Sequence, residues 1–236
     1  MKPIGFGGEN FDIINAKKII GWFSTLLIAG SLVLFVGAFG PVVFANLSYY
    51  VTKAFGSGWK LDTSTNSPSS SVQNVKTVIE RKPLSIKPAN LESSIVIEKI
   101  GVSAPIVINV SVQNQDAYKE ALRYGVAHAK GSALPGQTGN TFLFAHSSIN
   151  FWELGKYATV FNLIGKLEAG DIIVLFYKGE RFDYEVIDKR VVQGFNTLPL
   201  VRQTTYPILT MQTCDPPGTT LNRLIVTAVI KNSKLK

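Results

Sequence analysis

The chain has 236 residues and a mass of 25.8 kDa, which is room for one ordinary domain and a smaller segment. Hydrophobic residues make up 46% and charged residues 17%, which excludes wholesale disorder. The net charge is +8, of which residues 1–91 carry +5. The later part has no Lys/Arg cluster with interleaved aromatic residues, which argues against a nucleic-acid partner. The single cysteine excludes an intramolecular disulfide and a multi-thiolate zinc site.

A long uncharged stretch lies near the N-terminus. No charged residue occurs from Ile19 to Thr52, and a bilayer core requires about 20 apolar residues of helix. We therefore predict a transmembrane helix over residues 19–43, which Pro41 bends or ends near its far side. The apolar region of a cleaved signal peptide is only about 7–15 residues long, so the stretch is interpreted as a permanent anchor.

The charges beside this stretch predict its orientation. Lys17 and Lys18 directly precede it, and the positive-inside rule then assigns residues 1–18 to the cytoplasm. Lys53 and Lys60 on the other side oppose this orientation without reversing it. We expect a single-pass protein of the cell membrane with its C-terminal part outside the cytoplasm.

Residues 44–91 are predicted to be a flexible stalk. Their central part, residues 63–71, reads TSTNSPSSS and has almost no apolar side chain to bury. Such a segment supplies reach, since it lets a domain stand away from the membrane. The remaining residues, 92–236, are long enough for a domain with its own core.

Short apolar or alternating runs predict seven strands in this domain. The strands are 94–98, 105–110, 140–145, 171–177, 181–186, 208–212 and 224–231. Gly101 marks a turn between the first two, and Lys178-Gly179-Glu180 predicts a hairpin between the fourth and the fifth.

Two helices are predicted between the strands. The first covers residues 115–124 and stops at Gly125 as its C-cap, and the second covers residues 151–167. Seven or eight short strands with two small helices are typical of a mainly β domain, either an antiparallel barrel or a sandwich.

Three residues with complementary chemistry are predicted at strand ends. Cys214 ends an apolar strand and is followed by a Pro-Pro-Gly turn, and Arg223 begins the next strand. If these two strands are antiparallel neighbours, both residues lie at the same end of the sheet. His146 likewise follows a strand end. The three side chains could therefore converge on one rim.

A thiol, an imidazole and a guanidinium together describe acyl transfer through a thioester. The thiolate is the nucleophile, the imidazole titrates near neutrality and can protonate a departing amine, and the guanidinium stabilises an oxyanion. Each residue also has a structural interpretation. Cys214 could be a buried apolar residue, Arg223 a salt-bridge partner of Asp215 or Asp188, and His146 an edge histidine. His128, in a turn-rich segment, is the other candidate for the catalytic imidazole.

Two segments resemble sortases, the membrane-anchored cysteine transpeptidases of bacterial surfaces. Residues 213–226 read TCDPPGTTLNRLIV and resemble the family's Cys–Arg signature, with the arginine nine positions after the cysteine. Residues 125–146 read GVAHAKGSALPGQTGNTFLFAH and resemble the segment that leads to the family's catalytic histidine. A weaker likeness at residues 161–171 precedes a central strand, and the similarity covers about residues 92–231.

The resemblance implies more than the residue chemistry does. It implies an eight-stranded sortase-type β-barrel with two or three short helices, in a catalytic domain of residues 92–236 behind the transmembrane helix. Cys214 would cleave an LPXTG-like sorting signal of a surface protein between Thr and Gly, and an amine of a cell-wall precursor or a pilin lysine would then resolve the thioester. His146 would act as acid and base, Arg223 would hold the oxyanion, and Thr213 would help to shape the peptide pocket.

The chain departs from the family pattern beside the histidine. Ser147 and Ser148 stand where many relatives have arginine, and Ala145 stands where glycine is frequent. The TCxPxGT pattern is nearest to the class D and class E sortases. No cofactor is expected, and calcium binding by scattered loop carboxylates has no assignable residues.

Two alternatives belong to other classes. A wall-acting cysteine peptidase or L,D-transpeptidase would use the same nucleophile, but the order of His146 before Cys214 differs from papain-like peptidases, and the Ser-x-Gly-Cys-x-Arg run of L,D-transpeptidases is missing. A catalytically inactive, membrane-tethered binding or assembly domain would keep the barrel without a reactive Cys214.

Overall fold

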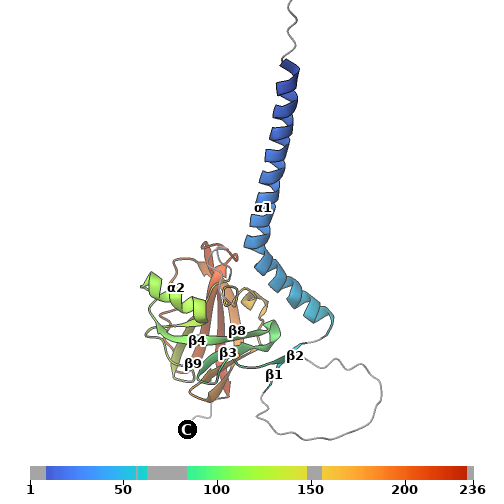
Figure 1. Ribbon diagram of the computed structural model, residues 1–236. Helices are drawn as coiled ribbons and strands as arrows, with labels where there is room; N and C mark the ends of the chain where they lie inside the picture. Colours follow the sequence, from blue (N-terminus) through green and yellow to red (C-terminus); the bar gives the residue numbers. More distant parts are fainter. Residues whose placement is uncertain (1–8, 57, 63–83, 148–155, 233–236) are drawn as a thin grey trace, which may run out of the picture. The chain divides into compact units, whose positions relative to one another are not determined.

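The computed structural model describes residues 9–56, 58–62, 84–147 and 156–232, and it divides into two compact units, Met1–Gly40 and Pro41–Lys236 (Figure 1). The polar part of the predicted stalk, within residues 63–83, and the start of the predicted helix 151–167 lie outside the described residues.

Helix α1 (Glu9–Ala54) contains the predicted anchor. Its window Ile20–Gly37 has a mean hydropathy of 2.0, and none of its side chains is buried within the protein, so by length and composition it can cross a membrane. The expectation that the helix could end near Pro41 is wrong, because α1 continues to Ala54. A proline removes one backbone hydrogen bond, and the uncharged run on its far side continues the helix.

Eight strands form a closed barrel (Figure 1). They are β3 (Ser93–Ile97), β4 (Val102–Val110), β5 (Val126–Ala129), β6 (Gly139–Phe144), β7 (Ile172–Tyr177), β8 (Glu180–Gln193), β9 (Pro207–Asp215) and β10 (Asn222–Asn232). Their order around the barrel is β10-β8-β7-β3-β4-β5-β6-β9. This confirms the mainly β, eight-stranded barrel.

The barrel is mixed and not antiparallel throughout. Strands β4 and β5 pair in parallel, as do β6 and β9. Parallel neighbours require a long crossover connection. Helix α2 (Gln115–Tyr124) makes the first crossover, and β7 and β8 lie between β6 and β9 along the chain. Local patterns along the sequence do not report these crossovers.

All seven predicted strands are present, and one strand of the barrel was missed. The missed strand is β5, which the glycine-rich composition of residues 125–131 had indicated to be a turn. Strand β8 also runs to Gln193, beyond the predicted end at residue 186. Its second half is mostly exposed, so it lacks the alternation of apolar and polar residues that marked its first half.

The hairpin between β7 and β8 is confirmed. Tyr177 pairs with Glu180, and the two loop residues, Lys178 and Gly179, have φ angles of 51° and 78°. Two positive φ values are the requirement of a type I′ turn, whose twist matches that of the flanking strands.

The predicted helix 115–124 is confirmed. The predicted helix 151–167 is wrong over its described part, residues 156–167. Helix α2 begins after Asn114, whose side-chain oxygen accepts a hydrogen bond from the Ala117 N–H at 3.0 Å. Residues 156–163 form turns, and only a short 3₁₀ helix, η2 (Ile164–Lys166), follows. The helical spacing of apolar residues there reflects packing into the core and not helical periodicity.

Gly125 ends α2 for a reason other than a left-handed cap. Its φ is 167°, an extended conformation that any residue adopts. A Cβ atom on Gly125 would lie 2.2 Å from the carbonyl oxygen of Pro105. Glycine is therefore required because β4 passes directly against this backbone.

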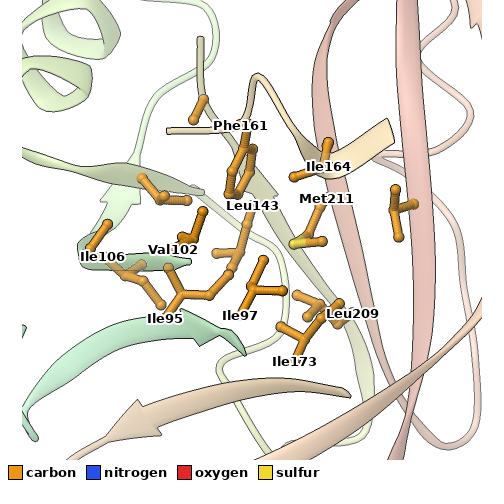
Figure 2. Packing of buried hydrophobic residues seen from close by; sticks show 14 of the residues in the cluster. Ile95, Ile97, Val102, Ile106, Leu143, Phe161, Ile164, Ile173, Leu209 and Met211 are labelled. Carbon is orange, nitrogen blue, oxygen red and sulfur yellow. The ribbon is translucent and has the colours of Figure 1, made fainter. Parts of the chain in front are cut away.

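The barrel interior holds the main core. Figure 2 shows the apolar side chains that meet there from several strands, with Ile95 and Ile97 of β3 facing Leu143, Leu209 and Met211 of other strands. Phe161 and Ile164 close this core from the loop before β7 and are fully buried. Each fully buried aliphatic or aromatic side chain contributes about 1.5–3 kcal/mol.

A second, smaller core lies on the opposite face of β3 and β7. The short parallel strands β1 (Trp59–Leu61) and β2 (Leu84–Ile86) pack against Val96, Val174 and Phe176. The Leu61 N–H also donates to Glu98 Oε1 at 2.8 Å. The described ends of the predicted stalk thus pack on the barrel, which composition had not indicated.

His128 is a structural residue of strand β5. Its side chain is only 2% exposed. Its Nδ1 accepts the Asn109 N–H at 3.2 Å, so Nε2 carries the proton and donates to Ala133 O at 3.0 Å. Burial lowers the pKa of His128, against a smaller opposing effect of the Ala133 carbonyl. The folded state therefore holds this histidine neutral.

The close approach at Gly125 predicts a large cost for a single methyl group. Gly125→Ala should lower the free energy of unfolding by about 1–3 kcal/mol, because the Pro105 backbone cannot move away without disturbing β4. Urea denaturation of the detergent-solubilised full chain measures this. Gly58→Ala is the control, since a Cβ there meets nothing within 4 Å. Equal stability of Gly125→Ala and the wild type would contradict the contact.

Burial of neutral His128 predicts a loss of stability in mild acid. Its folded pKa lies below the unfolded value of about 6.5, so the unfolded state takes up the proton first. The stabilisation is complete above that value and is lost as the pH falls below it. Thermal unfolding between pH 7.5 and 5 should show this fall for the wild type and for His146→Gln, but a smaller fall for His128→Gln. The same decrease in unfolding temperature with pH in all three proteins would contradict the conclusion that His128 is neutral in the folded state.

Candidate active site

Strand β9 lies at the centre of the candidate site. It pairs with β10 on one side in antiparallel fashion and with β6 on the other side in parallel. Hydrogen-bonded strands lie about 4.8 Å apart. Any residue at the end of β9 therefore has two neighbouring strands within side-chain reach.

The β9–β10 register brings the cysteine and the arginine together. Cys214 is the direct partner of Arg223, and Thr213 is the partner of Leu224. Directly opposed residues of antiparallel strands project from the same face of the sheet. The predicted neighbourhood of Cys214 and Arg223 thus follows from hydrogen-bond register.

The β6–β9 register brings the histidine to the same end. Phe144 is level with Gln212, and the next step continues the ladder, because the Ala145 N–H donates to Gln212 O at 3.2 Å. Two residues after Phe144 comes His146, and two residues after Gln212 comes Cys214. His146 and Cys214 therefore follow the last paired residues of β6 and β9 at the same end of the barrel.

Two hydrogen bonds hold the histidine segment in position. The buried Thr213 hydroxyl donates to Ala145 O at 2.9 Å, and the Phe161 N–H donates to His146 O at 3.3 Å. The Thr213 hydroxyl thus links the residue before the cysteine to the residue before the histidine.

The Arg223 guanidinium is held by its own loop. Its Nη1 donates to the carbonyl oxygens of Thr220 and Asn222 at 3.1 and 3.0 Å. Among the described residues Arg223 forms no ion pair, and Asp188 pairs with Arg190 instead. The salt-bridge interpretation of Arg223 is therefore not supported. A guanidinium has five N–H donors, so donors are left for a substrate carbonyl.

The loop after Cys214 returns the chain within a few residues. The Thr219 N–H and its hydroxyl both donate to Pro216 O, at 3.1 and 2.8 Å, and Gly218 has a φ of 82°. This turn keeps Cys214 half-buried at the rim and not in the interior, so the interpretation as a core cysteine is not supported.

Two polar side chains near the histidine are buried, which the sequence had not indicated. Ser147 is only 1% exposed, and its hydroxyl has no hydrogen-bond partner in the described structure. Both side-chain polar atoms of Asn162, next to Phe161, are likewise buried without a partner. Unpartnered buried groups are rare and often belong to functional sites. The sequence marked Ser147 only as a departure from the family pattern, and it did not mark Asn162.

An exposed apolar loop borders the site and was also missed. The Gly194 N–H donates to Leu221 O at 3.1 Å, two residues before Arg223. Phe195 and Leu198 follow, with exposed fractions of 82% and 71%. The loop is anchored by buried Asn140, whose Nδ2 donates to Pro199 O at 2.9 Å.

The described residues contain no group of three or more His, Cys, Asp or Glu side chains that could hold a metal ion. Glu168 and Asp171 lie together, but Lys99 Nζ bridges them at 3.0 and 2.8 Å. The hydrogen bond and charge of Lys99 lower the pKa of Glu168. The ammonium occupies the position that a cation would take.

The chain is similar to proteins of one known family. The sortase-domain family model matches residues 95–231. Sortase D of Bacillus subtilis (strain 168) is 31% identical over 134 residues, which are 56% of this chain and 59% of the relative. The chain thus spans about three fifths of the length of that relative, whose class agrees with the predicted likeness to class D and class E.

Solved structures agree with this match. Sortase C-1 from Actinomyces oris is 28% identical with a TM-score of 0.51, covering 61% of this chain and 76% of that chain. Sortase A from Corynebacterium diphtheriae is 27% identical, also with a TM-score of 0.51, covering 62% and 63%.

The barrel, the family match and the solved relatives point to the same conclusion. Cys214 and Arg223 are paired across β9 and β10, and His146 follows the neighbouring strand β6 at the same end of the barrel. The protein belongs to the sortase family of cysteine transpeptidases.

Proposed function

We propose that this sortase is anchored in the cell membrane by α1, with its N-terminus in the cytoplasm and its barrel outside. It cleaves an LPXTG-like sorting signal of a surface protein between Thr and Gly. It then transfers the acyl group to an amine, from a cell-wall precursor or a pilin lysine. Lys17 and Lys18 before the apolar window support the orientation.

The observation that carries this proposal is the pair of registers around β9. Cys214 is the partner of Arg223 on one side, and on the other side His146 follows the end of the neighbouring strand β6. This supports a nucleophile, an acid–base and an oxyanion-binding group within reach of one carbonyl.

The chemistry follows from these three groups. The Cys214 thiolate attacks the carbonyl carbon of the signal's threonine, and the oxygen takes the negative charge beside the Arg223 guanidinium. The C–N bond then breaks as His146 protonates the departing glycine amine, and a thioester remains. An incoming amine gives its proton to His146, attacks the thioester and releases the Cys214 thiolate. The two half-reactions mirror each other, so one imidazole serves both.

The exposed apolar loop supports recognition of an apolar peptide. Phe195, Leu198 and Leu221 present large side chains to solvent, with 70–82% exposed. Gly194 joins this loop to the segment before Arg223. A leucine of a sorting signal would bury apolar area there, at about 25 cal/mol per Å².

Loss of the nucleophile should abolish cleavage and transfer. The full chain in detergent is incubated with an LPXTG-type peptide library and an amine acceptor, and mass spectrometry follows cleavage, the thioester and the product. The full chain is used because β1 and β2 cover apolar residues of the barrel. Cys214→Ala should show no thioester and no product above background.

The outcomes separate the alternatives. Transfer that is lost in Cys214→Ala supports the transpeptidase and identifies the preferred signal. An intact library together with a Cys214 that no thiol probe labels would overturn the proposal in favour of an inactive binding domain. Cleavage with water but with none of the offered amines would overturn the transferase step.

A second test concerns the guanidinium. Arg223→Lys keeps the charge but loses the planar array of donors, so kcat/KM should fall by about 10²–10³-fold with the larger part in kcat. Steady-state kinetics with the preferred peptide measure this. Arg190→Lys, on β8 and paired with Asp188, is the matched control and should stay near the wild type. Equal activity of both variants would remove Arg223 from the mechanism.

A further inference from the structure

A large cavity lies away from the candidate active site, within the unit Pro41–Lys236. It has a volume of about 1180 Å³ and is lined by some of the residues within 44–56, 58–59, 98–103 and 156–163 and by parts of β7, β8 and β10. None of Cys214, His146, Arg223 and Thr213 lines it. The proposed reaction therefore makes no use of this cavity.

One wall of the cavity is apolar and aromatic. Phe44 and Tyr49 come from the last part of α1, and Tyr157, Val160 and Leu163 come from the loop before β7. Tyr49 also packs against the main core. Aromatic side chains of this kind are enriched where protein meets lipid head groups.

The charged side chains of the cavity leave a positive excess. Five cations and three carboxylates line it. Lys99 pairs with Asp171 at 2.8 Å, Arg181 with Asp183 at 2.7 Å, and Lys231 with Glu185 at 2.7 Å. Two lysines of the lining, Lys53 and Lys156, form no ion pair with any described carboxylate.

The remaining carboxylate of the lining, that of Glu98, is engaged by a backbone group. Its Oε1 accepts the Leu61 N–H at 2.8 Å. Lys53 and Lys156 are therefore the two cations of the cavity whose charge is available to an anionic ligand. An ammonium group binds a phosphate as a point charge.

A residue of the cavity wall lies close in sequence to the predicted membrane span, which favours an anionic lipid as the ligand. Phe44, on the cavity wall, follows the end of the apolar window at Gly37 by seven residues. Even fully extended, seven residues span at most about 25 Å. A chain that crosses the membrane through this window must therefore hold the cavity wall near the head-group layer.

The cavity also shares a segment with the active site. Tyr157, Val160 and Leu163 line the cavity, and the intervening Phe161 N–H donates to His146 O at 3.3 Å. A molecule bound in the cavity would touch the same short loop that holds the main chain of the histidine.

We propose that this cavity binds the phosphate of an anionic lipid head group through Lys53 and Lys156. The apolar wall contacts the glycerol and upper acyl region of the same lipid. The inference rests on the proposed membrane attachment, because only a membrane-anchored chain holds the cavity beside lipid head groups.

The test is a titration of the full chain in a non-ionic detergent with short-chain phosphatidylglycerol or short-chain phosphatidylcholine. The wild type should bind phosphatidylglycerol more tightly. Each lysine near such a charge contributes about fivefold, so Lys53→Gln with Lys156→Gln should weaken phosphatidylglycerol binding by about 25-fold. Lys119→Gln with Lys130→Gln, two exposed lysines elsewhere on the barrel unit, has the same net charge and should bind like the wild type.

Two further measurements locate the ligand. Ala45→Trp fills the cavity without changing any charge, so it should also abolish the preference. Hydrogen exchange should slow in residues 156–167 when phosphatidylglycerol is added, and exchange in α2 should not change. Equal binding of the two lipids, or the same loss in both double variants, would overturn the proposal.

Two control experiments complete the test. One distinguishes a lipid phosphate from a soluble phosphate, and the other tests the membrane anchor independently of the cavity. Inorganic phosphate that displaces phosphatidylglycerol at similar concentrations would overturn the lipid assignment in favour of a soluble anion. Membrane insertion is measured independently, as resistance of the full chain to alkaline carbonate extraction from vesicles. Because the titration is made in detergent, its failure concerns the cavity, whereas failure of the extraction test concerns the anchor.

Discussion

The structure depends on the hydrogen-bond ladders on both sides of β9. The parallel ladder with β6 makes Phe144 level with Gln212, and the antiparallel ladder with β10 makes Cys214 the partner of Arg223. A shift of either register by one residue would turn every side chain of that strand to the other face. The buried residues of β9, among them Leu209 and Met211, oppose such a shift because it would expose them. The packing of the core therefore fixes the strand register, and the register fixes the geometry of the site.

The barrel is covered where its outer face is apolar. Strand β3 buries Ile95 and Ile97 inside, and Val96 outside beneath β1 and β2. Both faces of β3 and β7 are consequently buried, and the two strands have continuous apolar sequences in place of alternation. The residues before the barrel thus belong to its folding unit, which is why a fragment that begins at residue 92 would expose Val174 and Phe176.

The loop before β7 connects several functions of the molecule. It closes the core with Phe161 and Ile164, holds His146 through a backbone hydrogen bond, and forms a wall of the cavity. Buried Asn162 and Ser147, which lack hydrogen-bond partners in the described structure, lie at this junction. His128 has both ring nitrogens engaged in hydrogen bonds and is a structural residue of the barrel.

The sequence by itself determined the long apolar helix, the seven strands with the clearest apolar patterns, helix α2 and the family, and it singled out the three candidate chemical residues. These are local properties, since periodicity, turn residues and a short motif act over neighbouring residues. Only the tertiary structure decided the strand order, the two parallel pairings, strand β5, the packing of β1 and β2, and the loss of the second predicted helix. Gly125 shows the reason: the glycine is required by contact with Pro105, twenty residues earlier in the chain, and not by its own helix. The neighbourhood of His146 and Cys214 has the same origin, because 68 residues of chain separate them and only the β6–β9 ladder brings them together.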